Sequence, residues 1–303
     1  MPRALRVRSY AKVNLGLEVL GTREDGYHEL RTLFQTIDVH DDIVLRPRPR
    51  ALVVKCRHPL VPTDDSNLAL RAARDLRRYA RVTTGVEIDL TKRIPVGGGL
   101  GGGSSNAAAV LMGLDRMWGL GLGPAGLLPL ARRLGADVPY FLLGGTALGL
   151  ARGDEVYPLR RQLRGWVVLV DPGLPVSTAN VFARIDSRLT PRENSTSIFH
   201  FVSRELEGVG VYRLLVNDLE EAAMEEAPAL RERVARIRDV LRGEGALVAA
   251  LSGSGSSFFG LFGDARAARR AGVALGSHGF PARVVRTLTL DQYRKAWTLP
   301  RAR

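Results

Sequence analysis

Residues 95–111 read PVGGGLGGGSSNAAAVL, and this stretch joins three kinds of local structure. A strand-like pattern covers residues 85–95, six of the first nine residues of the stretch are glycine, and a helix-forming run starts at Ser104. Glycine in such number is unfavourable, because each one loses more backbone freedom on folding than any other residue. A structural need, or a ligand that lies against bare backbone, has to offset that loss.

The order strand, glycine loop, helix creates a binding site for an anion. The loop N–H groups and the unsatisfied N–H groups of the first helical turn point at one place, where the helix dipole adds partial positive charge. The P-loop pattern GxxxxGK[ST] is absent, because no lysine follows a glycine of this loop. The dinucleotide pattern GxGxxG matches at Gly97, Gly99 and Gly102, but the acidic residue it needs about twenty positions later is missing. A tight turn alone needs fewer glycines, so the sequence favours a bound nucleoside triphosphate, held by a loop that is neither a P-loop nor a dinucleotide-binding loop.

The composition indicates a chain large enough for two domains. It has 303 residues, 45% of them hydrophobic, and a single cysteine, Cys56. One cysteine excludes a disulfide within the chain and a cysteine-rich zinc site, and it favours a reducing cytoplasm. The N-terminus has no apolar signal segment, and the most apolar stretch, residues 138–151, is too short and glycine-rich to span a membrane. We therefore expect a soluble cytoplasmic protein with no membrane partner.

The formal net charge of +13 comes almost entirely from arginine. Lysine occurs only at Lys12, Lys55, Lys92 and Lys295, and the arginines are spread along the whole chain. No basic helix, zinc-finger spacing or aromatic–basic alternation indicates a nucleic-acid site. The charge therefore favours a plain arginine-rich surface that attracts an anionic small-molecule substrate, with a nucleic-acid-binding protein as the alternative.

Hydrophobic periodicity predicts two successive sets of strands and helices. The first set comprises strands within residues 4–20, 23–49, 51–58 and 85–95, helices within 63–80, 104–119 and 126–135, and a glycine-rich strand and turn region at 136–159. A boundary is expected near residues 159–164. The second set comprises a strand at 166–170, a helix from Ser177, two helices within 217–245, a glycine hairpin at 252–257 between strands, a helix within 264–279 and a strand within 281–289. Asp65 or Ser66 is expected to cap the first helix, and Ser104, Ser105 or Asn106 the second.

Residues 95–109 resemble the phosphate-binding motif of the GHMP kinases. Six further segments resemble the same superfamily in its order along the chain: AKVNLGLEV, REDGYHELRTLFQTI, DDSNLALRAA, LGADVPYFLLGGTALGLARGDE, VNDLEEA and LSGSGSSFFGLF. The resemblance covers nearly the whole chain. It implies a two-domain α+β architecture, with an ATP-binding domain at residues 1–160 and a second domain at 161–303 that completes an active-site cleft. It also implies ATP as phosphate donor together with Mg²⁺.

The resemblance implies that Asp137 and Lys12 are the catalytic pair. Asp137, in GADVP, would accept the proton of the substrate hydroxyl, and its alternative role is a turn or helix-capping residue before Pro139. Lys12, in AKVN, would lie beside Asp137, keep it ionised and steady charge on the transferred phosphoryl group. Its alternative role is an exposed strand lysine.

The resemblance also implies a set of ATP-binding residues: Pro95, Gly97, Gly98, Gly99, Leu100, Gly101, Gly102, Gly103, Ser104, Ser105, Asn67 and Lys92. One of the two serines is expected to cap the helix, and the other to reach a phosphate oxygen or Mg²⁺, with Ser105 as the candidate metal contact. Asn67 equally suits the first turn of its helix. The SGSGSS loop is expected to close over the site from the second domain.

On the substrate side, the resemblance implies a cytidyl diphosphate alcohol, 4-diphosphocytidyl-2-C-methyl-D-erythritol, phosphorylated on its 2-hydroxyl. Tyr27 and His28 in DGYHEL suit stacking on a base and hydrogen bonding to its edge. Phe182 is expected to stack from the second domain, and Asn14 to hydrogen-bond the substrate. A related kinase for another alcohol would keep Asp137 but would have no need of the Tyr27–His28 pair. The histidines lack metal-ligand spacing, residues 186–208 carry no motif, and the sequence leaves the oligomeric state open.

Overall fold

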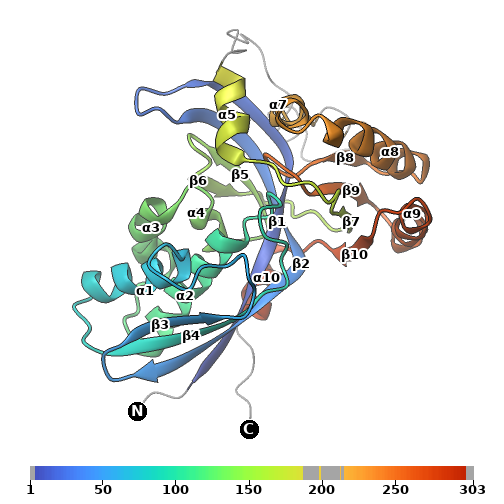
Figure 1. The fold of residues 1–303 in the computed structure, drawn as a ribbon. Coiled ribbons are helices and arrows are strands. Elements are labelled where there is room, and N and C mark those ends of the chain that lie inside the picture. Colours follow the sequence, from blue (N-terminus) through green and yellow to red (C-terminus); the bar gives the residue numbers. More distant parts are fainter. Residues whose placement is uncertain (1–3, 187–197, 199–211, 213–214, 298–303) are drawn as a thin grey trace.

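The computed structural model describes residues 4–186, 198, 212 and 215–297, which form two β-sheets with helices against them (Figure 1). The strands are β1 (Leu5–Thr22), β2 (His28–Arg48), β3 (Leu52–Cys56), β4 (Gly85–Thr91), β5 (Thr146–Leu150), β6 (Glu155–Pro158), β7 (Trp166–Val170), β8 (Val248–Leu251), β9 (Phe258–Phe262) and β10 (Ala282–Arg286). The helices are α1 (Leu68–Tyr79), α2 (Gly102–Trp118), α3 (Gly123–Leu134), α4 (Val138–Phe141), α5 (Thr178–Asp186), α7 (Leu219–Glu226), α8 (Ala229–Gly243), α9 (Ala265–Ser277) and α10 (Leu290–Ala296).

The first sheet is organised around the two long strands β1 and β2. They pair antiparallel over nearly their whole length. Strand β4 pairs with residues 42–48 of β2 and β5 with residues 32–35, and β3 and β6 lie outside these. Side chains of β1 alternate between two environments. Val13 and Leu15 are buried toward the second sheet, whereas Lys12 and Asn14 face a cavity on the other side.

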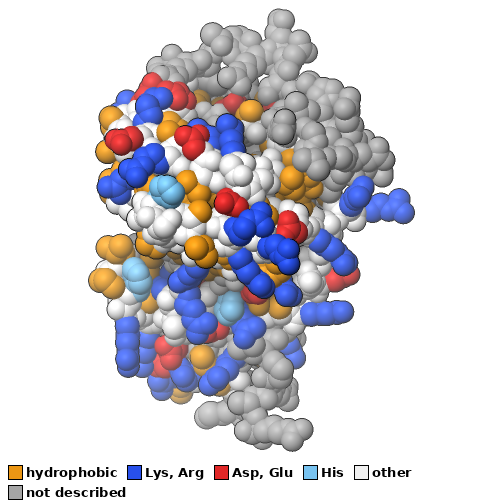
Figure 2. All heavy atoms as spheres, turned by 90° about the vertical axis from the view of Figure 1, so that its right-hand side faces the viewer, with side chains coloured by type: hydrophobic (Ala, Val, Ile, Leu, Met, Phe, Trp, Pro, Cys, Tyr) orange, Lys and Arg blue, Asp and Glu red, His pale blue; other side chains and the backbone are white. Residues whose placement is uncertain are grey.

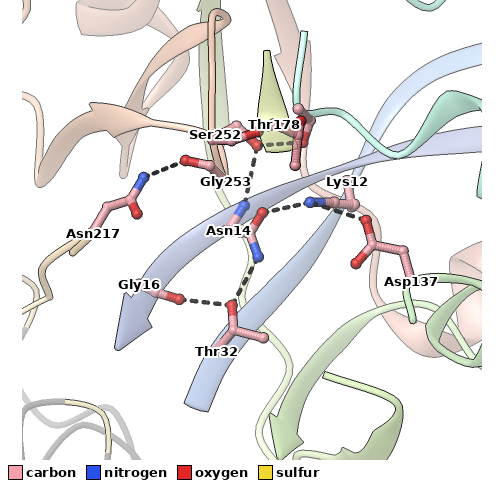
Figure 3. Close-up of polar contacts among 11 residues, drawn as sticks. Lys12, Asn14, Gly16, Thr32, Asp137, Thr178, Asn217, Ser252 and Gly253 are labelled. Atoms are coloured by element: carbon pink, nitrogen blue, oxygen red, sulfur yellow. Dashed lines mark hydrogen bonds and ion pairs between the residues drawn. The ribbon is translucent and has the colours of Figure 1, made fainter. Parts of the chain in front are cut away.

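The second sheet is antiparallel throughout, in the order β10-β7-β9-β8. Helices α8 and α9 lie along its outer side (Figure 1). The turn between β8 and β9, residues 252–257, is the predicted glycine hairpin, and it reaches back toward β1 (Figure 3).

Among the described residues, three large apolar cores hold these layers together. One lies between the first sheet and helices α1 to α4, the second between the two sheets, and the third between the second sheet and helices α5, α7, α8 and α9. The layer order helix, sheet, sheet, helix confirms the predicted α+β class, because each sheet buries one face on helices and the other on its partner sheet.

Helix α10 was not predicted. Thr289 accepts a hydrogen bond from Gln292 N, and Gln292 Oε1 accepts one from Thr289 N at 2.9 Å, which together form a capping box. The helix returns the chain to the first half of the molecule, where the Tyr293 hydroxyl donates to the Phe141 carbonyl oxygen. The end of the described chain is therefore packed beside the first sheet and not the second.

The starts of two helices differ from the prediction. Helix α1 is capped by Asn67, whose Oδ1 accepts from Ala69 N at 2.9 Å, so the expected cap at Asp65 or Ser66 is wrong. Helix α2 begins at Gly102 rather than Ser104. Its N-cap is Gly101, with φ of 69°, and no side chain caps it. The serines therefore lie inside the helix, because a glycine in the left-handed region turns the chain before them.

Charged side chains are distributed broadly over the surface. On the face seen in Figure 2, Lys and Arg side chains are spread across the described surface with Asp and Glu among them. Within the described residues, no helix is long and apolar enough to cross a bilayer. Of the segment 186–208, in which no motif was found, residues 187–197 and 199–208 lie outside the described part of the chain.

Candidate active site

Two neighbouring cavities lie on either side of the glycine loop. The first, about 390 Å³, is formed by the loop and the start of α1. The second, about 710 Å³, is formed by β1, β2, α5, the turn before α4 and the β8–β9 loop. Gly99, Gly101, Ser104 and Thr178 line both cavities. Ligands bound in the two cavities would therefore meet at the glycine loop.

The first cavity has the features of an anion site. The structure places nearly all predicted ATP-binding residues along it: Asn67, Lys92, Pro95, Gly97, Gly98, Gly99, Leu100, Gly101, Gly102, Gly103 and Ser104. The backbone N–H groups of residues 102–104 belong to the first turn of α2, which leaves them without partners inside the helix. The positive end of the α2 dipole lies at the same place.

The glycines also allow a second loop to approach. Ser257 N donates to the Gly98 carbonyl at 3.3 Å, and Ser252 Oγ donates to the Gly99 carbonyl at 3.0 Å. A Cβ at Gly98 would overlap Ser257 Oγ, and one at Gly99 would overlap the Ser252 carbonyl oxygen. Some of the glycines are thus required for close contact with the β8–β9 loop, a structural need beside the bound triphosphate that the sequence pattern favoured.

The two serines have different surroundings. Ser105 is only 1% exposed, its hydroxyl donates to the Tyr10 carbonyl at 2.6 Å, and it lines neither cavity. Ser104 is half-buried and lines both. The structure therefore contradicts the placement of Ser105 as a phosphate or Mg²⁺ contact, because its hydroxyl joins α2 to β1.

Lys92 is held at the edge of the first cavity by a buried carboxylate. Lys92 Nζ lies 2.5 Å from Asp41 Oδ2, and both side chains are almost completely buried. The other oxygen, Asp41 Oδ1, accepts from Arg93 N at 2.7 Å and from Ile94 N at 2.8 Å. Asp41 thus fixes both the lysine and the chain that leads into the glycine loop.

Asn67 lines the first cavity with its amide already engaged. Its Oδ1 caps α1, and its Nδ2 donates to the Pro62 carbonyl at 2.6 Å. These bonds place Asn67 at the N-cap of α1, directly before the first turn of the helix, and make it part of the cavity wall.

Lys12 and Asp137 meet in the second cavity (Figure 3). Lys12 Nζ lies 2.5 Å from Asn14 Oδ1 and 3.4 Å from Asp137 Oδ2. The Lys12 side chain is 5% exposed, whereas that of Asp137 is 34% exposed. The ammonium is therefore enclosed, while the carboxylate is accessible to a ligand. Asp137 precedes α4 but makes no side-chain capping bond, which argues against a purely structural role.

A hydrogen-bonded chain orients Asn14 (Figure 3). Asn14 Nδ2 donates to Thr32 Oγ1 at 2.8 Å, and Thr32 Oγ1 donates to the Gly16 carbonyl at 2.8 Å. The amide oxygen of Asn14 must then face Lys12, because its nitrogen is used by Thr32. The two strands thereby fix the position of the Lys12 ammonium.

Tyr140, close to Asp137 in the chain, is excluded as a base. Its hydroxyl donates to the Gly145 carbonyl at 2.8 Å and lies 2.6 Å from Thr36 Oγ1. Burial raises the pKa of Tyr140 well above its ordinary value, and the charge of Asp137 acts in the same direction. The phenol stays protonated, so Asp137 is the available proton acceptor among these residues.

Aromatic rings line the other end of the second cavity. Tyr27, His28 and Phe182 all reach it, with ring centroids of His28 and Phe182 4.9 Å apart. His28 is 8% exposed and Tyr27 is 55% exposed. The Arg152 guanidinium lies 4.8 Å from the Tyr27 ring centroid and donates to Asp154 at 2.8 Å. The contact of His28, from β2, with Phe182, from α5, connects the two halves of the molecule here.

Among the polar side chains of the second cavity, the sequence analysis did not single out Thr32, Arg152 and Thr178. Thr178 Oγ1 lies 2.7 Å from Ser254 Oγ, which joins the start of α5 to the β8–β9 loop. Arg152 and Thr32 lie inside segments that resemble the family, but residue type alone did not distinguish them. Their roles depend on contacts with distant elements, for which a single sequence carries no signal.

The described residues hold no group of three or more His, Cys, Asp or Glu side chains placed to bind a metal ion together. A cation in the first cavity would therefore rely on oxygen atoms of its ligand, beside the Ser104 hydroxyl.

Comparisons with known proteins agree over nearly the whole chain. The family model "GHMP kinases N terminal domain" matches residues 67–145, and "GHMP kinases C terminal" matches residues 208–280. The 4-diphosphocytidyl-2-C-methyl-D-erythritol kinase of Chlorobium luteolum is 42% identical over 272 residues, which cover 88% of this chain and 92% of the relative. The protein of the same name from Geobacter sp. (strain M21) is 42% identical over 289 residues, covering 94% of this chain and 100% of the relative.

Solved structures give the same result. A crystal structure of 4-(cytidine 5'-diphospho)-2C-methyl-D-erythritol kinase has a TM-score of 0.75 and 37% identity, covering 93% of this chain and 99% of the other. A homoserine kinase from Cytophaga hutchinsonii, at 20% identity and a TM-score of 0.76 over 95% of this chain and 96% of the other, shares the fold. The chain therefore belongs to the GHMP kinase superfamily and, within it, to the family of 4-diphosphocytidyl-2-C-methyl-D-erythritol kinases.

Proposed function

We propose that the protein transfers the γ-phosphate of ATP to the 2-hydroxyl of 4-diphosphocytidyl-2-C-methyl-D-erythritol, a step of the non-mevalonate route to isoprenoid precursors. The single observation that carries this proposal is the shared wall of the two cavities, beside which Lys12 and Asp137 lie. Family membership at 42% identity supports both the reaction class and the substrate.

Binding follows from the two cavities. The triphosphate lies against the glycine loop and the first turn of α2, where N–H groups and the helix dipole favour negative charge. The cytosine occupies the aromatic end of the second cavity, beside Tyr27, His28 and Phe182. The alcohol then reaches Asp137, and its hydroxyl oxygen faces the γ-phosphorus across the glycine loop.

The transfer itself is an in-line displacement. The substrate oxygen forms a bond to the γ-phosphorus while the bond from that phosphorus to the β,γ-bridging oxygen breaks, and ADP leaves. Asp137 accepts the hydroxyl proton. Lys12, fixed by Asn14, stabilises the charge on the phosphoryl oxygens. Because both groups are held by strands or short turns, they are in place before the substrate binds.

Mg²⁺ is proposed to arrive with ATP and to neutralise charge on its phosphates. The hydroxyl of Ser104, which lines both cavities, is the protein oxygen best placed to approach it. Such a hard cation keeps most of its ligands from phosphate and water, which suits a site without a carboxylate cluster among the described residues.

We also propose the division into an ATP-binding domain at 1–160 and a second domain at 161–303, and cytoplasmic activity. The strands of the first sheet lie within residues 5–158 and those of the second within 166–286, which supports the division. The single cysteine supports a reducing compartment.

The proposed reaction is tested by identifying its product. We expect incubation with ATP, Mg²⁺ and the cytidyl alcohol to give ADP and a phosphate monoester in equal amounts, with phosphorus NMR coupling that locates the ester on the 2-hydroxyl. Release of inorganic phosphate instead of an ester would contradict it.

A further inference from the structure

The segment VNDLEEA, residues 216–222, matches the family but has no place in the mechanism above. Its first part lies between the two sheets at the start of α7. Leu17 N of β1 donates to the Val216 carbonyl at 2.8 Å, and Asp218 N donates to the Leu17 carbonyl at 2.9 Å. Asp218 Oδ2 also accepts from Val19 N at 3.0 Å. This turn is therefore bound to the same strand that carries Lys12 and Asn14.

The same turn holds the β8–β9 loop. Asn217 Nδ2 donates to the Leu251 carbonyl at 2.9 Å. It also donates to the Gly253 carbonyl at 2.8 Å (Figure 3). Asn217 Oδ1 accepts from Leu219 N at 3.1 Å, so its amide orientation is set. Glu220 accepts from Leu251 N at 3.1 Å and pairs with Arg238. Leu251 and Gly253, the residues on either side of Ser252, are therefore held in place by residues 217–220.

The loop that is held in this way forms part of the active site. Gly253 and Ser254 line the second cavity, and Ser252 contacts both Asn14 N and the Gly99 carbonyl. A Cβ at Gly253 would lie 3.2 Å from Asn14 Oδ1. A shift of the loop would therefore displace Asn14, the residue that fixes Lys12.

We propose that Asn217 is a positioning residue for phosphoryl transfer: its amide sets the β8–β9 loop against β1 and so aligns Lys12 and Asn14 with the glycine loop. This inference rests on the proposed function. Asn217 itself does not line either cavity, so it acts through the loop. A substitution of Asn217 is therefore expected to lower kcat, because a small displacement of catalytic groups lowers the rate strongly.

The test compares Asn217→Asp with an uncharged control change at an exposed asparagine, Asn180→Ser. The carboxylate introduced by Asn217→Asp is the same size as the amide but turns an acceptor toward two carbonyl oxygens, which displaces the loop. Asn180 is exposed, donates to Glu226 at 2.6 Å and lies outside both cavities. We expect Asn217→Asp to lower kcat for the cytidyl alcohol about 10- to 100-fold, with the KM for ATP unchanged and folding cooperative. Asn180→Ser should keep wild-type kinetics, because Glu226 retains its ion pair with Arg184.

Wild-type kcat in folded Asn217→Asp, or a KM for ATP that rises in parallel with the loss of kcat, would overturn the proposal. If Asn217→Asp does not fold, Asn217→Ser, which keeps one donor, replaces it, and a wild-type kcat in that variant would also overturn the proposal. Failure of the proposed function would give a different result: the wild-type protein itself would not phosphorylate the cytidyl alcohol.

Discussion

Lys12 of β1 and Asp137 of the turn before α4 approach to 3.4 Å between Nζ and Oδ2. The lysine is enclosed and the carboxylate is open to the larger cavity, so the pair presents a fixed positive charge beside an accessible base. Phosphoryl transfer needs both features in one place, since charge develops on the phosphate while the alcohol loses its proton.

Replacing Asp137 tests whether its carboxylate is the general base. We expect Asp137→Asn to lower kcat about 10²- to 10⁴-fold, the range that general base catalysis supplies. Binding of ATP should be retained, because Asp137 lines only the second cavity. Steady-state kinetics and ATP titration measure the two effects, with the exposed Asp239→Asn as a matched control. Full activity would remove Asp137 from the mechanism, and loss of ATP binding as well would indicate a structural role.

Substitutions of the two adjacent serines of α2 should have different effects: one should change the kinetics and the other the stability of the fold. Ser104→Ala is expected to raise the KM for ATP or lower kcat, because its hydroxyl lines both cavities. Ser105→Ala should keep the KM for ATP but lower the free energy of unfolding by about 1–3 kcal/mol, since the Tyr10 carbonyl loses its buried donor. Denaturant titration and kinetics of both variants check this. An unchanged stability with a raised KM in Ser105→Ala would reverse the assignment.

The aromatic end of the second cavity should determine affinity for the base. We expect Phe182→Leu to raise the KM for the cytidyl alcohol about tenfold through lost stacking, with the KM for ATP unaffected. Inhibition by cytidine diphosphate should weaken by a similar factor, which shows that the base and not the alcohol is affected. Equal effects on both substrates would contradict a cytosine site at this position.

Protonation of His40 should destabilise the fold. Burial, followed by the charge of Arg8, lowers the pKa of His40 below its ordinary 6.5, while Asp42 and Asp38 oppose the shift. The unfolded chain therefore binds this proton more readily than the folded chain. The contribution of neutral His40 to the free energy of unfolding is complete above pH 6.5 and is lost as pH falls through the lowered pKa. In urea titrations at several pH values, His40→Gln should lose less stability than wild type on acidification from neutral pH. An identical pH dependence would contradict this.

The sequence predicted the features that depend on local pattern. Alternation at the start of the chain predicted a strand, which the structure shows as β1, and the glycine stretch between a strand and a helix indicated the anion site. Helix α10 could also have been predicted, because Thr289 and Gln292 have the spacing of a capping box. Local signals were present in all of these cases.

Features that depend on distant contacts were not predictable from one sequence. Ser104 and Ser105 are identical in type and adjacent, and only the approach of Tyr10 gives Ser105 a structural partner. The closeness of Gly98 and Gly99 to the β8–β9 loop likewise depends on how two halves of the chain pack. Such contacts are set by tertiary structure and leave no periodicity to recognise.

The measurement that tests the proposed function most directly is ADP formation from ATP and Mg²⁺ with four acceptors in parallel: the cytidyl alcohol, homoserine, mevalonate and galactose. Turnover with the cytidyl alcohol alone is predicted, because the Tyr27, His28 and Phe182 end of the cavity suits a base that the other three alcohols lack. Turnover with one of the other alcohols, and none with the cytidyl compound, would contradict the substrate while leaving the fold and the phosphate site in place.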